Sequence, residues 1–253
     1  MIGILREGNR FYQDITVPCY DADASQVMKP AAFMDMAQEI AHWAAELLGA
    51  GFDALAEHKT AWVLSRMHIH FTEMPRWRDD VRLWTWHKGF NGLFFIRDFI
   101  LQDASGAGRI TCTSSWIVLN TETRHLMRSL DDIPLLDPSS AGEGDAIAEP
   151  APKIQMPAGA AFEPAGEHKV VYSDVDFIGH TNNVRYMVWA MDSLDAETLS
   201  RRPKDAYINF NRETHPGEIV ELRKACVQED SSVVYYIEGL VEGRQSFIVK
   251  LVY

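Results

Sequence analysis

The stretch that decides the fold runs from Ser173 to Tyr186 and reads SDVDFIGHTNNVRY. It places two acids, a glycine, a histidine and two asparagines directly before an amphipathic segment. Glycine permits a tight backbone turn, and asparagine at the start of a helix satisfies amide groups that lack intrahelical partners. The first amides of a helix carry partial positive charge and can hold an anion or a developing oxyanion. The pattern therefore predicts a helix N-terminus that faces a cluster of titratable side chains.

Outside this stretch the chain repeats one succession of predicted elements. A strand over residues 11–20 and a loop over 21–29 come first. The helix that follows begins at Pro30 and ends near Gly49, because apolar residues recur between them at helical spacing. Four extended segments are then predicted at 60–71, 80–88, 93–101 and 108–119.

The second succession follows a change in composition. Residues 131–167 are rich in Pro, Ala, Gly and Ser, and they predict a linker that packs over the surface. A strand over 169–173 then leads through the motif into a helix over 183–199. The last predicted strands are 206–212, 219–228, 232–240 and 246–253.

This repetition predicts two copies of one α+β unit, each a curved antiparallel sheet wrapped round a long central helix. We expect an N-terminal repeat over 1–130, a linker over 131–167 and a C-terminal repeat over 168–253 that carries the motif. Each repeat then has roughly a hundred residues, which is a normal size for such a unit.

The composition limits the classes of function. A formal net charge of −12 disfavours nucleic acid as a partner, because phosphate binding needs concentrated Lys and Arg. No apolar run is long enough to span a bilayer, and the opening residues lack the pattern of a signal peptide. We therefore expect a cytoplasmic protein without a membrane partner. The three cysteines are widely spaced and form no CxxC, so neither a metal site nor another cofactor is expected.

Several motifs together carry a resemblance to a known family. SDVDFIGHTNNVRYMVW resembles the DxDxxGHxNNxxY motif of hotdog-fold thioesterases. The first half adds the segment 60–69, the pair Thr85-Trp86, the triplet Arg97-Asp98-Phe99 and the segment 114–124. With these motifs the chain is similar, over nearly everything except the linker, to the acyl-acyl-carrier-protein (acyl-ACP) thioesterases of plants and bacteria.

The resemblance implies a double (tandem) hotdog fold and a hydrolytic activity. The implied reaction converts fatty acyl-ACP thioesters to free fatty acid and carrier thiol and so terminates fatty acid synthesis. The implied partner is acyl carrier protein bearing a fatty acyl-phosphopantetheine group, and a homo-oligomer is compatible with this assignment. Three alternatives stay open, namely an acyl-CoA thioesterase of the same fold, a hotdog dehydratase and a non-catalytic acyl-thioester binding protein.

The resemblance also assigns residues. The catalytic Asp of the family falls on Asp176, its catalytic His on His180 and a strand-associated Glu on Glu213. Two positions depart from the plant pattern. Ile178 stands where plant members carry an Asn, and Thr214 stands where they carry a Cys, so a cysteine nucleophile is excluded at that position.

Thioester hydrolysis needs an activated water or a nucleophile and a donor for the carbonyl oxygen. Asp176 or Glu213 is the candidate general base, and direct attack by Asp176 is the alternative. His180 has three candidate roles, which are to hold the water, to donate to the thioester oxygen or to orient a carboxylate. Backbone amides from Gly179 to Asn183 are the candidate oxyanion donors. We expect Asn182 and Asn183 mainly to fix the loop and cap the helix.

Two further interpretations concern residues outside the motif. The loop over 21–29 occupies the place of the motif in the first repeat and keeps Asp21 and Asp23 but has no histidine, which predicts a single active site in the second repeat. Asp174 is interpreted as a surface or loop acid. The cations at 201, 202 and 204 are interpreted as complements of a helix C-terminus, with a basic patch for an acidic carrier as the alternative.

Overall fold

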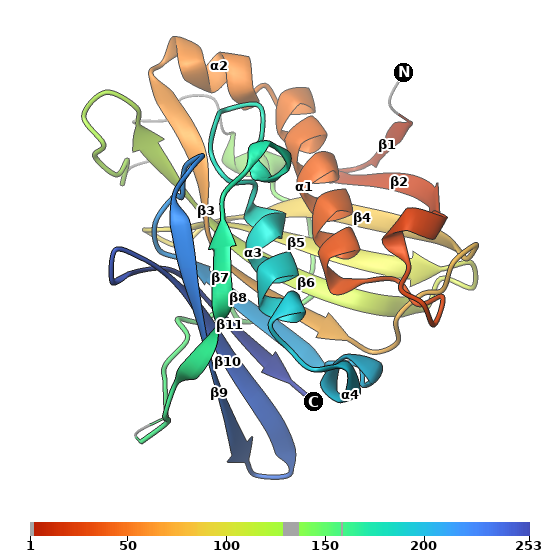
Figure 1. The fold of residues 1–253 in the computed structure, drawn as a ribbon. Helices are drawn as coiled ribbons and strands as arrows, with labels where there is room; N and C mark the ends of the chain where they lie inside the picture. Colours follow the sequence, from red (N-terminus) through yellow and green to blue (C-terminus); the bar gives the residue numbers. More distant parts are fainter. Residues whose placement is uncertain (1–2, 129–136, 158) are drawn as a thin grey trace. The chain divides into compact units, whose positions relative to one another are not determined.

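We analysed a computed structural model of the chain, which describes residues 3–128, 137–157 and 159–253. The chain forms two compact units, the first made of Met1–Ser65 and Phe71–Ala151 and the second of Arg66–His70 and Pro152–Tyr253. Each unit is an antiparallel sheet with a helix packed against it (Figure 1). This agrees with the predicted α+β class.

In the first unit six strands form a sheet, and one long helix packs against it. Helix α1 (Pro30–Leu47) begins with proline at its first position, as predicted, and packs on β2 and β4. A short helix that we did not predict, α2 (Phe52–Glu57), follows it. The strands lie side by side in the order β1 (Ile4–Glu7), β2 (Arg10–Thr16), β4 (Asp80–Phe90), β5 (Phe95–Asp103), β6 (Gly108–Asn120) and β3 (Thr60–Phe71).

In the second unit the motif-bearing helix packs on a sheet of the same strand order. Helix α3 (Asn183–Asp192) lies on β10 and β11, and α4 (Ala196–Ser200) follows it. Residues 66–70 of β3 pair with β8 at the edge of this sheet. The remaining strands follow in the order β8 (Asp205–Phe210), β11 (Arg244–Val252), β10 (Ser232–Val241), β9 (Ile219–Glu229) and β7 (Glu163–Lys169).

Two predicted elements of the second unit are wrong. The predicted helix over 183–199 ends at Asp192, because Asp195 caps a new helix by accepting a hydrogen bond from the Thr198 amide at 2.8 Å. The predicted strand over 169–173 is instead the end of β7 followed by a 3-10 turn, Tyr172–Asp174. Short polar side chains that bond to nearby amides compete with regular structure in both places.

The described part of the predicted linker divides between the two units at Ala151 and Pro152. Beyond this point the Ile154 amide donates to Asn209 Oδ1 in the second unit at 2.7 Å, and before it the chain is tied to the first unit. The Gly142 amide donates to the His87 carbonyl at 2.9 Å, and the Ala146 amide donates to Asp98 Oδ2 at 2.7 Å. Trp86 Nε1 donates to the Gly144 carbonyl at 3.0 Å. Residues 131–136 and 158 of the predicted linker lie outside the described residues, and β7 begins within its predicted range.

The base of α3 rests on a closely packed aromatic group. The Phe247 ring is fully buried and lies 4.8 Å from the Tyr186 ring and 6.3 Å from the Trp189 ring, measured between centroids. Gly239 on the neighbouring strand β10 leaves the space that this ring occupies, since a Cβ atom there would overlap Phe247. The position therefore requires glycine for steric reasons.

We expect Gly239→Ala to destabilise the protein by about 1–3 kcal/mol, the usual cost of forcing extra volume into a packed core. Urea unfolding of the variant and the wild type measures this difference. Gly108→Ala is the matched control, because a Cβ atom there would meet only Ile100 Cγ2 at an ordinary 3.7 Å. Equal midpoints for both variants would contradict the proposed overlap.

The first unit buries an imidazole in its sheet. His87 on β4 is 7 % exposed, pairs across the sheet with Arg97 on β5, and accepts a hydrogen bond from the Gly89 amide at 3.1 Å. Its Nε2 atom has no hydrogen-bond partner among the described residues. Burial, with a smaller effect of the Arg97 charge, lowers the pKa of His87 from 6.5 to about 4.

A lowered imidazole pKa makes stability depend on pH. The folded state resists protonation of His87. The contribution of the neutral imidazole to the free energy of unfolding is therefore fully present above pH 6.5 and is lost as the pH falls towards 4. The shift corresponds to roughly 3 kcal/mol. Urea unfolding at several pH values between 7 and 4 should show this loss in the wild type and in His58→Gln, which removes an exposed histidine. In His87→Gln that part of the pH dependence should be absent, and parallel profiles would refute the assignment.

Candidate active site

The motif folds into a loop that the side chain of Asp176 closes. Its Oδ1 atom accepts hydrogen bonds from the amides of Ile178 (3.1 Å) and His180 (3.3 Å), and its own amide donates to the His180 carbonyl at 2.9 Å. Gly179 lies in the left-handed region with a φ of 85°. Other residues rarely adopt this conformation, so glycine permits the turn. No described residue contacts the second oxygen, Asp176 Oδ2, by a hydrogen bond, so the closure of the loop does not use this oxygen.

Asp174 holds the two ends of the loop together. Its carboxylate accepts hydrogen bonds from the Val171 amide (2.9 Å) and His168 Nε2 (2.8 Å), and its carbonyl accepts one from the Asn182 amide (2.8 Å). Asp174 was interpreted as a surface or loop acid: it does lie in the loop, but it is 5 % exposed, so the surface interpretation is wrong. A carboxylate with two donors can be buried where an unpaired one cannot.

The asparagines lie where α3 begins. Asn182 is the N-cap, and its side chain accepts a hydrogen bond from the Val184 amide at 2.9 Å. Asn183 is the first residue of the helix. The amides of Gly179, His180, Thr181 and Asn182 already donate to protein acceptors, as do those of Val184 and Arg185. Of the predicted oxyanion donors from Gly179 to Asn183, the Asn183 amide is therefore the candidate that remains.

A buried group of hydroxyls connects the motif to the turn between β8 and β9. Thr214 Oγ1 donates to Thr181 Oγ1 at 2.6 Å, and the Thr181 amide donates to the Thr214 carbonyl at 3.0 Å. The Tyr186 hydroxyl lies 3.1 Å from Thr214 Oγ1 and accepts from the Thr214 amide at 3.2 Å. Burial raises the pKa of Tyr186, so the phenol stays protonated. These contacts hold Glu213 in place, since it directly precedes Thr214.

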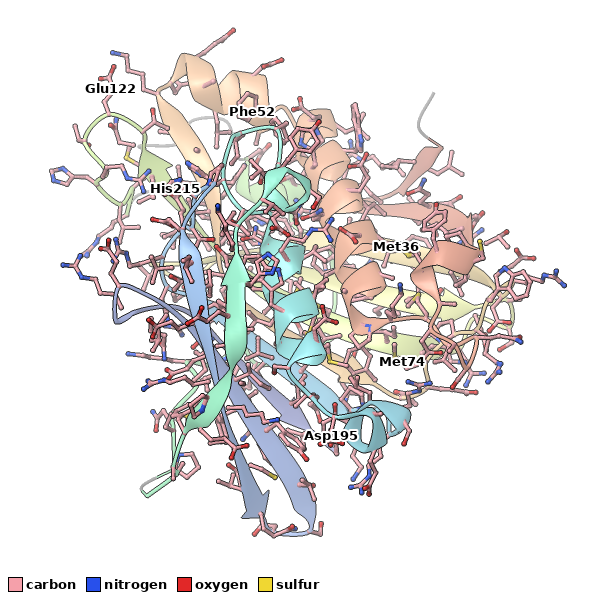
Figure 2. The ribbon with its side chains drawn as sticks, viewed as in Figure 1. Met36, Phe52, Met74, Glu122, Asp195 and His215 are labelled. Atoms are coloured by element: carbon pink, nitrogen blue, oxygen red, sulfur yellow. The ribbon has the colours of Figure 1, made fainter. Side chains whose placement is uncertain are left out.

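The titratable side chains of the site meet beside this anchor. His180 Nδ1 lies 3.7 Å from Glu213 Oε1, with the two side chains 32 % and 29 % exposed. The ring of His215 lies against His180, with centroids 5.0 Å apart and planes 79° apart. Figure 2 shows His215 at the turn that precedes β9. The structure thus brings together His180 and Glu213, which were predicted, with His215, which was not.

The first unit contains a loop with the same hydrogen bonds. Asp23 Oδ1 accepts from the amides of Ser25 (2.8 Å) and Val27 (3.1 Å), as Asp176 Oδ1 accepts from residues two and four positions later. Gln26 has a φ of 63°, where the second loop has glycine. The turn around Asp176 is therefore an architectural feature that does not need a histidine.

Both loops are anchored to the sheet in the same way. The Met28 amide donates to the Pro75 carbonyl at 2.8 Å, and the Thr181 amide donates to the Thr214 carbonyl at 3.0 Å. This match places Val27 at the position of His180, and Met74 at the position of Glu213. Val27 in the first loop and Met74 in the turn between β3 and β4 are both apolar and 8 % exposed. The imidazole and carboxylate pair is therefore found in the second loop and not in the first.

Sequence reasoning missed several residues that build the site. Tyr186 lies within the helix predicted over 183–199 but had no predicted role in the site, and neither had His168, Thr181 and His215. The signal that could have found Thr181 and Tyr186 is a hydroxyl at an otherwise apolar position beside the motif. The signal for His215 is its place two residues after Glu213.

The remaining predicted features lie away from this cluster. Arg201 pairs with Glu197 at 2.8 Å, and Arg202 Nη1 donates to the Leu199 carbonyl at 3.3 Å, as expected of cations at a helix C-terminus. Within the described part of the chain, no group of three or more His, Cys, Asp or Glu side chains could hold a metal ion. None of the helices in that part has the length and apolarity to cross a membrane.

Comparison with known proteins identifies the family. Residues 8–135 match the acyl-ACP thioesterase N-terminal domain, and residues 163–250 match the acyl-ACP thioesterase C-terminal domain. The chain belongs to the acyl-ACP thioesterase family. The two matches leave out most of the predicted linker between them.

Plant members of the acyl-ACP thioesterase family are similar in sequence. The chain is 27 % identical over 251 residues to oleoyl-acyl carrier protein thioesterase 1, chloroplastic, of Arabidopsis thaliana, covering 90 % of this chain and 64 % of that protein. It is 28 % identical over 230 residues to palmitoyl-acyl carrier protein thioesterase, chloroplastic, of Gossypium hirsutum, covering 86 % of this chain and 55 % of that protein. The chain therefore spans only part of the length of these relatives.

Solved structures of acyl-ACP thioesterases share the fold. An acyl-ACP thioesterase from Bacteroides thetaiotaomicron superposes with a TM-score of 0.83 at 22 % identity, covering 96 % of this chain and 97 % of that chain. The 12:0-ACP thioesterase from Umbellularia californica superposes with a TM-score of 0.85 at 19 % identity, covering 97 % and 94 %. At this identity the likeness shows the fold and not the substrate.

We expect Thr214→Val to destabilise the protein by about 1–3 kcal/mol, because the buried Tyr186 hydroxyl loses its acceptor. Tyr186→Phe removes the other half of the contact. The loss of stability in the double variant should therefore be smaller than the sum of the two single losses. Urea unfolding of the four proteins measures the coupling, and strictly additive losses would show that the hydroxyls do not act together.

Proposed function

We propose that this chain hydrolyses fatty acyl-ACP thioesters to free fatty acid and carrier thiol and thereby terminates fatty acid synthesis. The observation that supports the proposal most directly is the His180–Glu213 pair beside the Asp176 loop at the start of α3. Membership of the acyl-ACP thioesterase family gives the substrate class. The proposed partner is acyl carrier protein with a fatty acyl-phosphopantetheine group.

We also propose that the two units form a tandem hotdog. The succession β2, α1, β3, β4, β5 and β6 in the first unit corresponds to β7, α3, β8, β9, β10 and β11 in the second. The strand order is the same in both sheets, and the loops before α1 and α3 have matching hydrogen bonds. A duplicated hotdog in which one copy has apolar residues at the catalytic positions accounts for these correspondences.

In the proposed reaction a carboxylate of the site takes a proton from water while the water oxygen attacks the thioester carbon. The carbonyl oxygen becomes an oxyanion, for which the Asn183 amide at the start of α3 is the candidate donor. When the intermediate collapses, the C–S bond breaks and the carrier thiolate takes up the proton. His180, with Glu213 at Nδ1, holds the water in position.

Direct attack by Asp176 is the alternative chemical route, because Asp176 Oδ2 is not used by the loop. It would produce an acyl-aspartyl anhydride that water then cleaves. A single turnover in ¹⁸O-labelled water distinguishes the routes. Attack by water on the thioester puts the label in the fatty acid, whereas cleavage of the anhydride at the aspartyl carbon puts the label in Asp176 and leaves the fatty acid unlabelled.

A substrate panel tests the proposed function. The purified protein is offered acyl-ACP and acyl-CoA thioesters of equal chain length, from short to long, and the release of free thiol is measured. The proposal expects faster hydrolysis of acyl-ACP. Equal or faster hydrolysis of acyl-CoA would favour an acyl-CoA thioesterase, and stoichiometric binding without thiol release would favour a non-catalytic binder. Ile178 supports the last alternative, because its side chain cannot bond to water or a carbonyl.

The matching loops provide an internal control for catalysis. Asp176→Asn keeps an oxygen that can accept the loop amides but removes the charge, so we expect kcat to fall at least about 100-fold with little change in Tm. Asp23→Asn makes the same change in the first loop and should leave kcat within about twofold of the wild type. Thiol release and thermal unfolding measure both effects. Equal losses in the two variants would refute a single active site in the second unit.

A further inference from the structure

His215 contacts the candidate catalytic histidine from the solvent side. Its ring packs edge to face with His180 at a centroid distance of 5.0 Å, and its side chain is exposed. The backbone amide of His215 donates to Glu218 Oε2 at 2.7 Å, which orients the turn that carries the ring. His215 lies in the turn between β8 and β9 (Figure 2). Half-buried His180 therefore has an exposed imidazole beside it.

The two imidazoles in contact come from different segments of the second unit, His180 from the motif loop and His215 from the turn before β9. The anchor contacts match Thr214 with Pro75, so His215 corresponds to Arg76 in the first unit. His180 corresponds to Val27 by the same match. The first unit has Val27 and Arg76 at these two positions, whereas the second unit has two histidine rings in contact. The pair is thus not a requirement of the shared loop geometry.

Thioester hydrolysis near neutral pH has to release a proton. Water contributes two protons, one of which stays on the product thiol, whose pKa is about 8.5. The other leaves because the product carboxylic acid has a pKa of about 4. One proton per turnover must therefore pass from the half-buried site to solvent. An imidazole is the side chain best suited to accept and release a proton in this pH range.

We propose that His215 is a proton-relay residue that passes the proton released in each turnover from His180 to solvent. The inference rests on the proposed hydrolysis. His180 takes up the proton that the ionising product releases, transfers it to the adjacent His215 directly or through one water, and returns to its neutral state. His215 then loses the proton to solvent or buffer. No oxidant, reductant or further reactant is needed.

The charges around the relay suit a transient imidazolium. Glu213 lies 3.7 Å from His180 Nδ1, and Glu218 bonds to the main chain of His215. Arg212 in the same turn is exposed and forms no ion pair with a described residue. Two carboxylates thus lie near the two rings, and the charge of the exposed arginine is screened by solvent.

The experiment compares His215→Gln with the wild type on the acyl-ACP that the wild type hydrolyses fastest, at pH 7 and low buffer concentration. Glutamine keeps a polar side chain of similar size but cannot carry the proton. We expect kcat to fall about tenfold, less than the loss of a general acid or base, with KM unchanged. Added imidazole should restore kcat in a concentration-dependent manner, because free imidazole replaces the missing relay. His58→Gln, at an exposed site in the first unit, is the control.

The imidazole titration distinguishes a proton relay from a packing contact. An unchanged kcat in His215→Gln overturns the proposal, and so does a lower kcat that imidazole does not restore, because that result indicates only a packing contact with His180. His215→Asn serves as a second variant should His215→Gln unfold, as judged by Tm. If the wild type releases no thiol from any thioester, the proposed hydrolysis itself fails, and this result is distinct from failure of the relay.

Discussion

The contact between Thr181 and Thr214 is the constraint on which the candidate site depends. These residues are 33 positions apart in the chain, and their buried hydroxyls and main-chain groups join the motif loop to the turn before β9. His180 precedes one of them and Glu213 precedes the other. The separation of the imidazole and the carboxylate is therefore set by a hydrogen-bonded anchor and not by a direct bond between them. Such anchoring suits catalysis, which requires side chains held in place before substrate arrives.

The match between the two loops shows that much of the motif is architectural. The loops around Asp23 and Asp176 have the same side-chain and main-chain hydrogen bonds, although only the second has a histidine. One oxygen of Asp176 is consequently engaged in shaping the turn, which leaves the other for chemistry. His180 and Glu213 are specific to the second unit, because the first unit has apolar residues at the matching positions. His215 is also specific to the second unit, since the first unit has Arg76 at the matching position.

The second unit also shows how this chain accommodates its departures from the plant pattern. At the position where a plant member has cysteine, the Thr214 hydroxyl supports Tyr186 and Thr181, so the residue has a structural role. At position 178 the side chain is apolar and 47 % exposed, while its amide is one of the two that bind Asp176. The closure of the loop therefore uses the main chain at position 178 and does not depend on the side chain there.

The sequence by itself determined the α+β class, the long helix beginning at Pro30, most strands and the grouping of Asp176 with His180. These features depend on local patterns, such as helical spacing of apolar residues, and on spacing within one loop. Tertiary structure alone decided the ends of β7 and α3, where polar side chains bond to nearby amides. It also decided that Asp174 is buried and that His215 lies on His180, because hydrogen bonds and packing between distant segments leave no periodic signal in the sequence.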